Sequence, residues 1–358
     1  MLEAIVNALS EEGPMSSRRN VVTCLVIVVV SMMPLFSAAQ STSVAPTPWG
    51  DPDLQGVWDY RTITPLERPE DQPDKEFLTE EEAASLEQNI LDRNALLLTR
   101  APERTSASNQ VDRREDGTPG FYNNFWLDRG TTAVGTRRTS LIVDPADGRL
   151  PKLTPEAQRR ADSSEAQRIA QVRRGDQPAQ SWTDLDAGDR CIQHAKAGPP
   201  ISVGGYNNNI QLFQIPGYVA MLNEQNHDVR IIPLDERPNV GSQISQWMGD
   251  SRGHWEDETL VVETVQFNGK HDQIGRPLLS TGENLSLVER FTRTDSDTLL
   301  YEFTVTDPTI WINPWTVELP MKRNPDLIYE FACHEGNYGL YNIMAGSRME
   351  EVVAAEAR

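Results

Sequence analysis

The stretch NIQLFQIPGYVAMLNEQNHDVRIIPL, residues 209–234, decides the fold class. It holds three segments rich in apolar residues, NIQLFQI, YVAMLNE and DVRIIPL. The turn Pro216-Gly217 separates the first two, and a short polar connection separates the second from the third. Short apolar segments bounded by turn residues are typical of antiparallel strands. The stretch therefore predicts two consecutive hairpins.

The same pattern continues toward the C-terminus. Further strands are predicted at SQISQWM (242–248), GHWE (253–256), TLVVETVQF (259–267), LSLVERFTRT (285–294), LLYEFTVT (299–306), PWTVELP (314–320) and LIYEFACH (327–334). No apolar periodicity of helix length lies between them, which argues against a parallel α/β sheet. We expect a mainly β protein whose antiparallel meander forms a barrel or a sandwich. A propeller is the alternative, because GHWEDETLVVET (253–264) has the rhythm of one blade.

Carboxylates alternate with apolar residues in several of these strands, as Glu263, Glu289 and Glu318 illustrate. Successive residues of a strand point to opposite faces. If the sheet closes on itself, some of these carboxylates point into its interior. The alternative is that they lie on the outer face and pair with bases such as Arg290 and Arg293, because charged groups are seldom buried without partners.

The N-terminal 39 residues predict export. Arg18 and Arg19 precede the apolar run VVTCLVIVVVSMMPLF (21–36), and small residues follow it before Gln40. This is the pattern of a secretory signal peptide with its natural start at Met15. The run is short and interrupted for a membrane span, although an uncleaved anchor is the alternative. We expect a periplasmic or secreted protein with no stable membrane insertion after cleavage.

The rest of the chain divides by composition into a Ser/Thr/Pro linker (40–52), a polar region with helices (53–200), a β domain (201–348) and a tail (349–358). We expect the polar region to pack on the β domain. Within it, a capping box of Thr79 and Glu82 predicts a helix over residues 80–98. Thr154 and Pro155 predict the start of a second helix that runs to residue 174.

The charge of the chain excludes one class of partner. The sequence has 53 acidic and 33 basic residues and a net charge of −20. Such a chain repels phosphate backbones, and no basic run interrupts it. We therefore expect a small-molecule ligand or substrate and not a nucleic acid.

Two cysteines remain after signal cleavage, Cys191 and Cys333. In an exported protein two cysteines are most often joined, so we predict a disulfide between them. Chain-entropy models assign a bridge over so long a loop a stabilisation of about 4 kcal/mol.

The strongest catalytic candidates lie where two predicted strands meet: Glu224 ends the first strand, and His227 and Asp228 begin the second. A hairpin end places such residues close together at one rim of a barrel, where an acid and a base of different pKa share proton transfer. His334 and Glu335 are candidates for the same site. The alternative is a polar turn whose side chains bond the backbone.

The stretch GDSRGHWEDE (249–258) is the second polar candidate. Asp250 and Arg252 are expected to lock a turn through a charged hydrogen bond. Ser251 lies in a G-x-S-x-G pattern, but a nucleophile elbow needs a helix after it and a strand is predicted here. We predict neither a metal site nor an organic cofactor. A metal-dependent enzyme built from the dispersed histidines is the weakest alternative. Those histidines are His227, His254, His271 and His334.

Aromatic and amide side chains are the candidates for ligand binding, because they suit rings and amphipathic molecules. Ordinary core and turn residues are the alternative. The candidates, together with one arginine and one histidine, are Tyr206, Asn208, Arg230, Trp247, His254, Trp311 and Trp315.

Two resemblances bear on these expectations. Gly56-x-Trp58 at the start of a predicted strand is similar to the first strand of lipocalin-like barrels, which favours a barrel. A separate resemblance, to a family of exported bacterial proteins of unknown activity, implies export but no reaction. It covers most of the mature chain, through RTSLIVDPADGRLP (138–151), YNNNIQLFQIPGYVAMLNEQNHDVRIIPLD (206–235), GDSRGHWEDETLVVET (249–264), ERFTRTDSDTLLYEFTVTDP (289–308) and YEFACHEGNYGLYN (329–342).

The sequence thus predicts a pocket for a small amphipathic or aromatic molecule in an extracytoplasmic β-barrel. Cofactor-free acid–base chemistry, in a lyase, isomerase or hydrolase, would suit the His and Glu/Asp residues. A non-catalytic ligand carrier or surface-binding module is the alternative.

Overall fold

The computed structural model describes residues 45–99, 128, 130–173, 176–194, 196–270, 272–273, 276–280 and 284–357. All of these residues belong to the unit Val44–Arg358. The predicted signal peptide and His271 lie outside the described residues. None of the helices in the described ranges is both long enough and apolar enough to cross a membrane.

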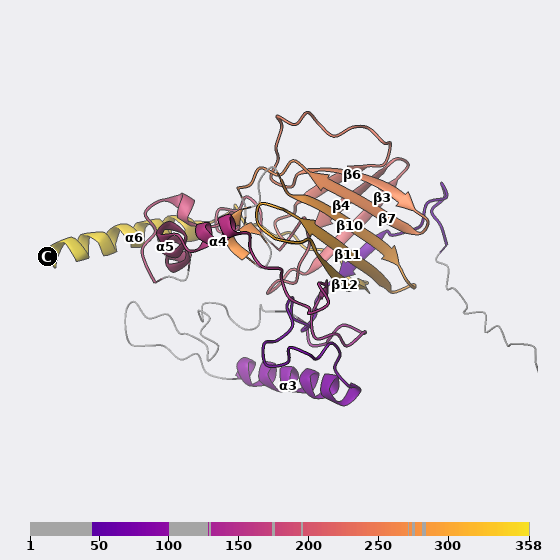
Figure 1. Ribbon diagram of the computed structural model, residues 1–358, viewed down its shortest axis with the longest axis horizontal. Helices are drawn as coiled ribbons and strands as arrows, with labels where there is room; N and C mark the ends of the chain where they lie inside the picture. Colours follow the sequence, from indigo (N-terminus) through magenta and orange to yellow (C-terminus); the bar gives the residue numbers. More distant parts are fainter. Residues whose placement is uncertain are drawn as a thin grey trace, which may run out of the picture. The chain divides into compact units, whose positions relative to one another are not determined.

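An antiparallel sheet of ten strands forms the centre of the structure (Figure 1). Its strands are β1 (Gly56–Asp59), β2 (Ile142–Asp144), β3 (Asn209–Ile215), β4 (Tyr218–Asn223), β5 (Val229–Pro233), β6 (Asp250–Glu256), β7 (Thr259–Val265), β10 (Ser286–Arg293), β11 (Thr298–Thr306) and β12 (Trp315–Asn324). The predicted antiparallel β architecture is confirmed.

The strand order is β5-β4-β3-β1-β12-β11-β10-β7-β6. Strand β1 lies between β3 and β12 and joins two meanders into one sheet, while β2 pairs with β12. The region before residue 200 therefore contributes two strands to the sheet. Between the edge strands β5 and β6, the described residues form no strand pairing, so the sheet is not closed by hydrogen bonds.

Alternation along the long strands builds the core. In β11, Leu299, Tyr301, Phe303 and Val305 are buried, and the residues between them are half-exposed. The rings of Phe291, Tyr301, Phe303 and Trp315 contact one another in series, with neighbouring centroids 4.8–5.8 Å apart. One face of the sheet is therefore packed with large side chains, and Glu289 is the carboxylate among them. Glu263 is exposed, and Glu318 is half-buried.

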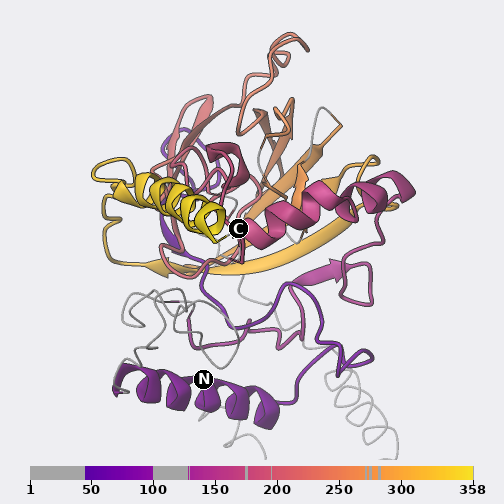
Figure 2. The same cartoon turned by 90° about the vertical axis from the view of Figure 1, so that its left-hand side faces the viewer.

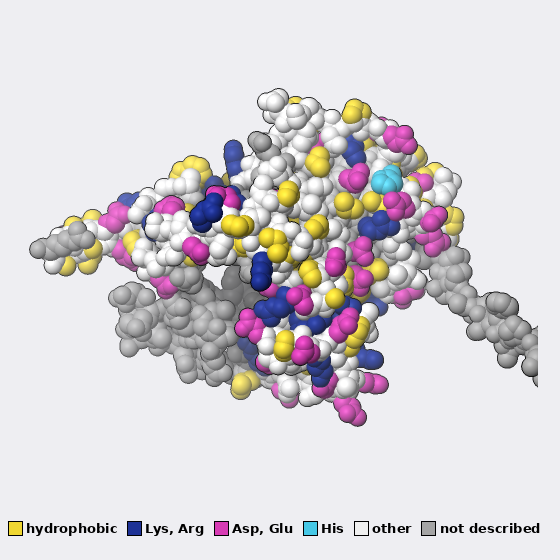
Figure 3. All heavy atoms as spheres, viewed as in Figure 1, with side chains coloured by type: hydrophobic (Ala, Val, Ile, Leu, Met, Phe, Trp, Pro, Cys, Tyr) yellow, Lys and Arg dark blue, Asp and Glu magenta, His cyan; other side chains and the backbone are white. Residues whose placement is uncertain are grey.

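The outer surface carries charges of both signs. On the face shown in Figure 3, Asp and Glu side chains are interspersed with Lys and Arg, and apolar side chains are scattered among them. The Asp250–Arg252 contact of 2.7 Å is the charged hydrogen bond expected from the sequence, although it lies within β6 and not in a turn. Glu256 pairs with Arg290 at 2.9 Å on the outer face.

The predicted helix over residues 80–98 is α3 (Glu80–Thr99), with the Thr79–Glu82 capping box present. The second predicted helix is two helices, α4 (Pro155–Ala161) and α5 (Ser164–Arg173). The break arises because the Ser163 hydroxyl accepts a hydrogen bond from the N–H of Ala166 and so caps a new helix.

Two predicted strands are wrong. Residues 327–334 are irregular, and the Phe331 N–H bonds a side chain instead of a neighbouring strand. Residues 242–248 are also irregular apart from a single parallel bridge between Gln246 and Phe267. The small sheet of β8 (Asp272–Gln273) and β9 (Arg276–Ser280) was not predicted.

Helix α6 (Tyr338–Glu356), also not predicted, runs through the expected boundary at residue 348. Asn337 caps it by accepting from the Leu340 N–H. Leu340 and Met344 pack against a small second core of Val172, Ala179 and Leu185, which joins α6 to α5 and to the 3₁₀ turn η2 (Trp182–Asp184). Figure 2 shows α6 and the α4–α5 segment on the same side of the sheet.

Candidate functional site

One end of the sheet combines buried polar side chains with an unusual turn. We call it the polar end and define it by Gln193, Asn208, Asn223, Glu224, Gln225 and Asp228, of which all but the last are buried. The β4–β5 turn supplies three of these residues, Glu224, Gln225 and Asp228. Amide and carboxylate groups are mostly exposed in proteins, so their concentration here calls for a chemical explanation.

The β4–β5 turn reverses the chain through two left-handed residues, Asn226 (φ 63°) and His227 (φ 55°). Asparagine and histidine tolerate this conformation better than most residues with a Cβ atom. Glu224 fixes the entrance to the turn. Its N–H donates to the Asn209 carbonyl at 3.0 Å, and its Oε2 accepts from Asn209 Nδ2 at 2.7 Å.

Tyr60 is a fully buried neighbour of this carboxylate. Burial raises the pKa of its phenol far above the ordinary value, and the negative charge of Glu224 adds to the effect. Tyr60 is therefore a neutral phenol at physiological pH and does not act as a base. Its hydroxyl donates to the Asn207 carbonyl at 3.4 Å.

His227 is held by the irregular segment before the disulfide. Its Nε2 accepts a hydrogen bond from the backbone N–H of Phe331. The neutral ring therefore carries its proton on Nδ1. The Phe331 ring stacks on Tyr206, with centroids 6.4 Å apart and planes 13° apart. The predicted candidates Tyr206 and His227 thus share one neighbour, Phe331.

Asp228 is the carboxylate whose environment is most perturbed. Burial raises its pKa from 3.8 to about 6. Its Oδ2 is enclosed and has no hydrogen-bond partner among the described residues. The backbone of Asp228 accepts from the Asn223 N–H at 2.9 Å, so these two residues face each other across the hairpin. A carboxyl group that titrates near neutrality is suited to exchange protons with a ligand.

Two buried amides complete the polar end. Gln193 Nε2 donates to the Gly198 carbonyl at 2.9 Å, and Asn223 Nδ2 donates to the Ala197 carbonyl. The oxygens of both amides, Gln193 Oε1 and Asn223 Oδ1, have no donor in the described part of the chain. Neither residue was predicted from the sequence, because an isolated Gln and an inward Asn at a strand end match no motif.

Arg230 is buried one step further into the sheet. Its guanidinium binds both carboxylate oxygens of Glu289 at 2.6 and 3.0 Å, and the Tyr301 hydroxyl donates to Glu289 Oε1 at 2.7 Å. Burial opposes the charge on Arg230, but the Glu289 charge and hydrogen bonds outweigh it and the pKa of Arg230 is raised. Tyr301 Oη also accepts from the Ile201 N–H at 3.0 Å. The guanidinium of Arg230 donates to Glu289 and to the Met221 sulfur. Arg230 therefore has a structural role in the core and is not a ligand-binding residue.

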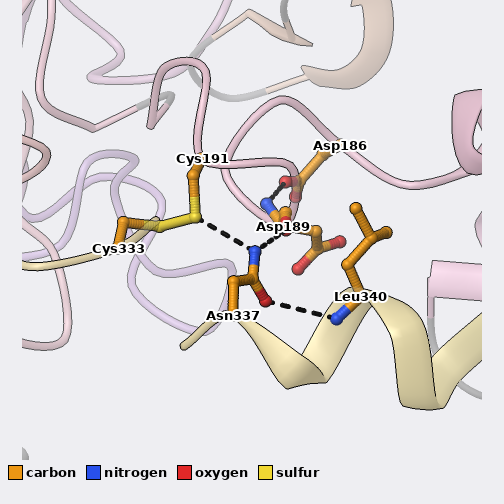
Figure 4. The surroundings of a disulfide bond; sticks show 6 residues. All are labelled: Asp186, Asp189, Cys191, Cys333, Asn337 and Leu340. Carbon is orange, nitrogen blue, oxygen red and sulfur yellow. Dashed lines mark hydrogen bonds between the residues drawn. A yellow bond between two sulfur atoms is a disulfide. The ribbon is translucent and has the colours of Figure 1, made fainter. Parts of the chain in front are cut away.

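The predicted disulfide between Cys191 and Cys333 is present (Figure 4). Asn337 lies beside it: its Nδ2 donates to Cys191 Sγ at 3.2 Å and to the Asp189 carbonyl at 3.4 Å. The disulfide therefore attaches the segment between β12 and α6 to the loop before Gln193. His334 and Glu335 follow it and are exposed.

The structure brings only some of the predicted residues together. Glu224, His227 and Asp228 share the turn, whereas the described residues show no hydrogen bond or ion pair between the turn and His334 or Glu335. Asn208 stabilises its own loop, accepting from the Gly204 N–H at 2.6 Å. The remaining candidates lie elsewhere: Trp311 and Trp315 are in the core, Trp247 is half-buried in a loop, and His254 is exposed on β6 beside Glu256.

Ser251 lies within β6 and hydrogen-bonds Thr264 at 2.9 Å, so it is not on a strand-to-helix elbow. In the ranges that the structure describes, no three His, Cys, Asp or Glu side chains are placed to hold a metal ion. Comparisons of the chain with protein-family models, with curated proteins and with solved structures found no match.

Proposed function

We propose that the protein binds a small molecule at the polar end and transfers a proton to or from it through Asp228. The observation that carries this proposal is the enclosed Asp228 Oδ2, which has no partner among the described residues and belongs to a carboxyl group with a pKa of about 6. Near pH 7 such a group is largely a base, and its protonated form stays accessible. A lyase, isomerase or hydrolase reaction would use this property.

His227 and Glu224 have supporting roles in this proposal. His227 keeps Nδ1–H available as a donor because Phe331 occupies Nε2. Glu224 orients Asn209 and closes the turn. Left-handed backbone at a residue with a Cβ atom costs of the order of 1 kcal/mol and is concentrated at functional sites. The conformation of His227 is therefore consistent with a role in binding.

The packed interior supports a site at the end of the sheet and not within it. Trp58, Phe291 and Phe303 are among the fully buried side chains of the inner face. The sheet curves so that β5 and β6 approach: a methyl group at Gly253 would lie 2.7 Å from Leu234 Cδ2 and 2.9 Å from Ile232 Cγ2. We take this as support for a barrel-like arrangement. The disulfide supports export to an oxidising compartment, periplasmic or secreted.

Proton transfer in deuterated water tests the proposal without a known substrate. The mature protein is incubated with a mixture of small metabolites in D₂O, and mass spectrometry records deuterium uptake and new products. We expect at least one compound to change with the native protein, and the rate to fall by about 100-fold or more in Asp228→Asn, which matches the loss of a general acid or base.

The matched control is Asp235→Asn, which removes an exposed carboxylate just after β5. It should leave the rate unchanged. Turnover that survives Asp228→Asn, or a mixture in which nothing changes with the native protein, would contradict the proposal.

A further inference from the structure

Helix α6 carries apolar side chains on two sides. On one side Leu340 and Met344 pack against the second core, and Ser347 Oγ accepts from the Ala179 N–H at 3.0 Å. A second apolar stripe lies about 130° around the helix from these residues, at about 100° per residue. Its members follow one another at spacings of three or four residues and are Tyr338, Tyr341, Ala345, Met349 and Val352.

The second stripe is exposed over most of its length. Tyr338 is 73% exposed, Tyr341 is 72% exposed and Met349 is 62% exposed, while Ala345 in the middle is half-buried. In Figure 1 the C-terminal half of α6 extends away from the sheet. A helix face that borders solvent ordinarily carries charged and polar residues, so an apolar stripe in this place favours a further packing partner.

The order of side chains along the stripe is self-complementary. Tyr341 and Met349 are each four residues from Ala345, and Tyr338 and Val352 are each seven residues from it. In an antiparallel pair of α6 helices with its two-fold axis at Ala345, Tyr341 of each copy therefore faces Met349 of the other, and Tyr338 faces Val352. Each contact sets an aromatic ring against an aliphatic or thioether side chain, and contacts between sulfur and aromatic rings are favourable. The small Ala345 at the axis allows the helices to approach closely.

The charges of α6 also favour the antiparallel arrangement. The first turn of the helix contains no acidic residue and the last turn no basic residue, so no side-chain charge of the helix complements its dipole. Glu350, Glu351 and Glu356 lie in the C-terminal half. An antiparallel pair places these carboxylates beside the positive N-terminal end of the second helix, whereas a parallel pair would bring the carboxylates of both copies together.

We infer that the exposed stripe of α6 binds the same stripe of a second copy of this chain, with the two helices antiparallel. Such an interface is isologous, so each residue of the stripe contributes to it twice. The stripe is about 21 Å long, which accommodates the Ala345 crossing and the aromatic contacts on either side of it. The inference does not depend on the proposed function, because the stripe contains neither Asp228 nor His227.

Sedimentation equilibrium of the full mature protein measures the association. We expect a monomer–dimer equilibrium with a dissociation constant of about 1–100 µM, the range of a small interface. A protein that stays monomeric up to about 1 mM would overturn the inference.

Two substitutions test the register of the helices. Tyr341→Lys and Met349→Glu should each raise the dissociation constant by about 100-fold or more, because each introduces a charge at two places in the interface. Both side chains are exposed, so neither substitution disturbs the core. The double variant Tyr341→Lys with Met349→Glu should recover most of the loss, because the antiparallel register brings the introduced amine of each copy to the introduced carboxylate of the other. A double variant that associates no better than the single variants would contradict the inference.

Ile215→Glu is the matched control on another apolar surface. Ile215 is 59% exposed on β3, and Phe213 and Ile231 are exposed on the same face of the β3–β4–β5 strands. This variant should associate as the native protein does. Association that is lost in Ile215→Glu and kept in Tyr341→Lys would place the interface on the sheet and overturn the inference.

Discussion

Replacing Glu289 by glutamine is expected to lower the free energy of unfolding by about 3–5 kcal/mol. The substitution keeps the shape of the side chain but removes the charge that compensates Arg230 in the interior. Glu289 is fully buried and Arg230 is 7% exposed, so water does not replace the lost partner. Chemical denaturation of the mature protein, followed by tryptophan fluorescence, measures the change.

Two other variants separate the charge effect from a general loss of packing. Glu263→Gln changes an exposed carboxylate on β7, a strand that pairs with β10, and should alter the free energy by less than about 0.5 kcal/mol. The double variant Glu289→Met with Arg230→Met should recover much of the loss, because apolar side chains often replace a buried ion pair at little cost. A Glu289→Gln variant as stable as the native protein would show that the pair is not buried in solution.

Removal of the disulfide is expected to lower the free energy of unfolding by about 2–5 kcal/mol. Cys191 and Cys333 are 142 residues apart, so the bridge restricts a large part of the unfolded chain. It also joins the segment that contains Phe331, whose N–H bonds His227 in the β4–β5 turn, to the loop at Cys191. The double variant Cys191→Ser with Cys333→Ser, measured in the same denaturation experiment, gives the effect.

Dithiothreitol supplies the control for the disulfide. It should lower the stability of the native protein to that of the double serine variant and leave the variant unchanged. If the reductant destabilised both proteins equally, the destabilisation would not be caused by reduction of the Cys191–Cys333 bond. If neither reduction nor substitution changed the stability, the bridge would contribute nothing to the fold.

Local chemistry in the sequence predicted the elements that depend on neighbouring residues. The turn Pro216-Gly217 placed the β3–β4 hairpin, and the Thr79–Glu82 capping box placed the start of α3. The disulfide was predicted from the two cysteines that follow the predicted signal peptide. Each of these predictions used information contained in a few adjacent residues or in the number of cysteines.

The features that were missed depend on contacts between distant residues. Strand β1 lies between β3 and β12, although about 150 residues separate β1 from β3. The Phe331 N–H bonds His227 across 104 residues, and for this reason an apolar segment that resembles a strand is irregular. Helix α6 carries apolar residues on several sides, so no single stripe indicated it.

The residues of the candidate site also divide into those predictable from adjacent sequence and those that depend on contacts between distant residues. Glu224, His227 and Asp228 were predicted as site residues because the alternation of the flanking strands and the turn between them were visible in the sequence. Gln193 and Asn223 were not predicted, since only folding brings their amides to the carbonyls of residues 197 and 198. Trp311 and Trp315 were predicted as ligand contacts and are core residues in the structure.

The titration of Asp228 tests the central claim most directly. Carbon-13 NMR of the side-chain carboxyl, assigned by its loss in Asp228→Asn, follows the group in the native protein. Burial of the carboxyl predicts a midpoint near pH 6, so the group should be mostly protonated at pH 5 and mostly ionised at pH 7. A midpoint near the ordinary 3.8 would show a solvated carboxylate and contradict its assignment as the acid–base group.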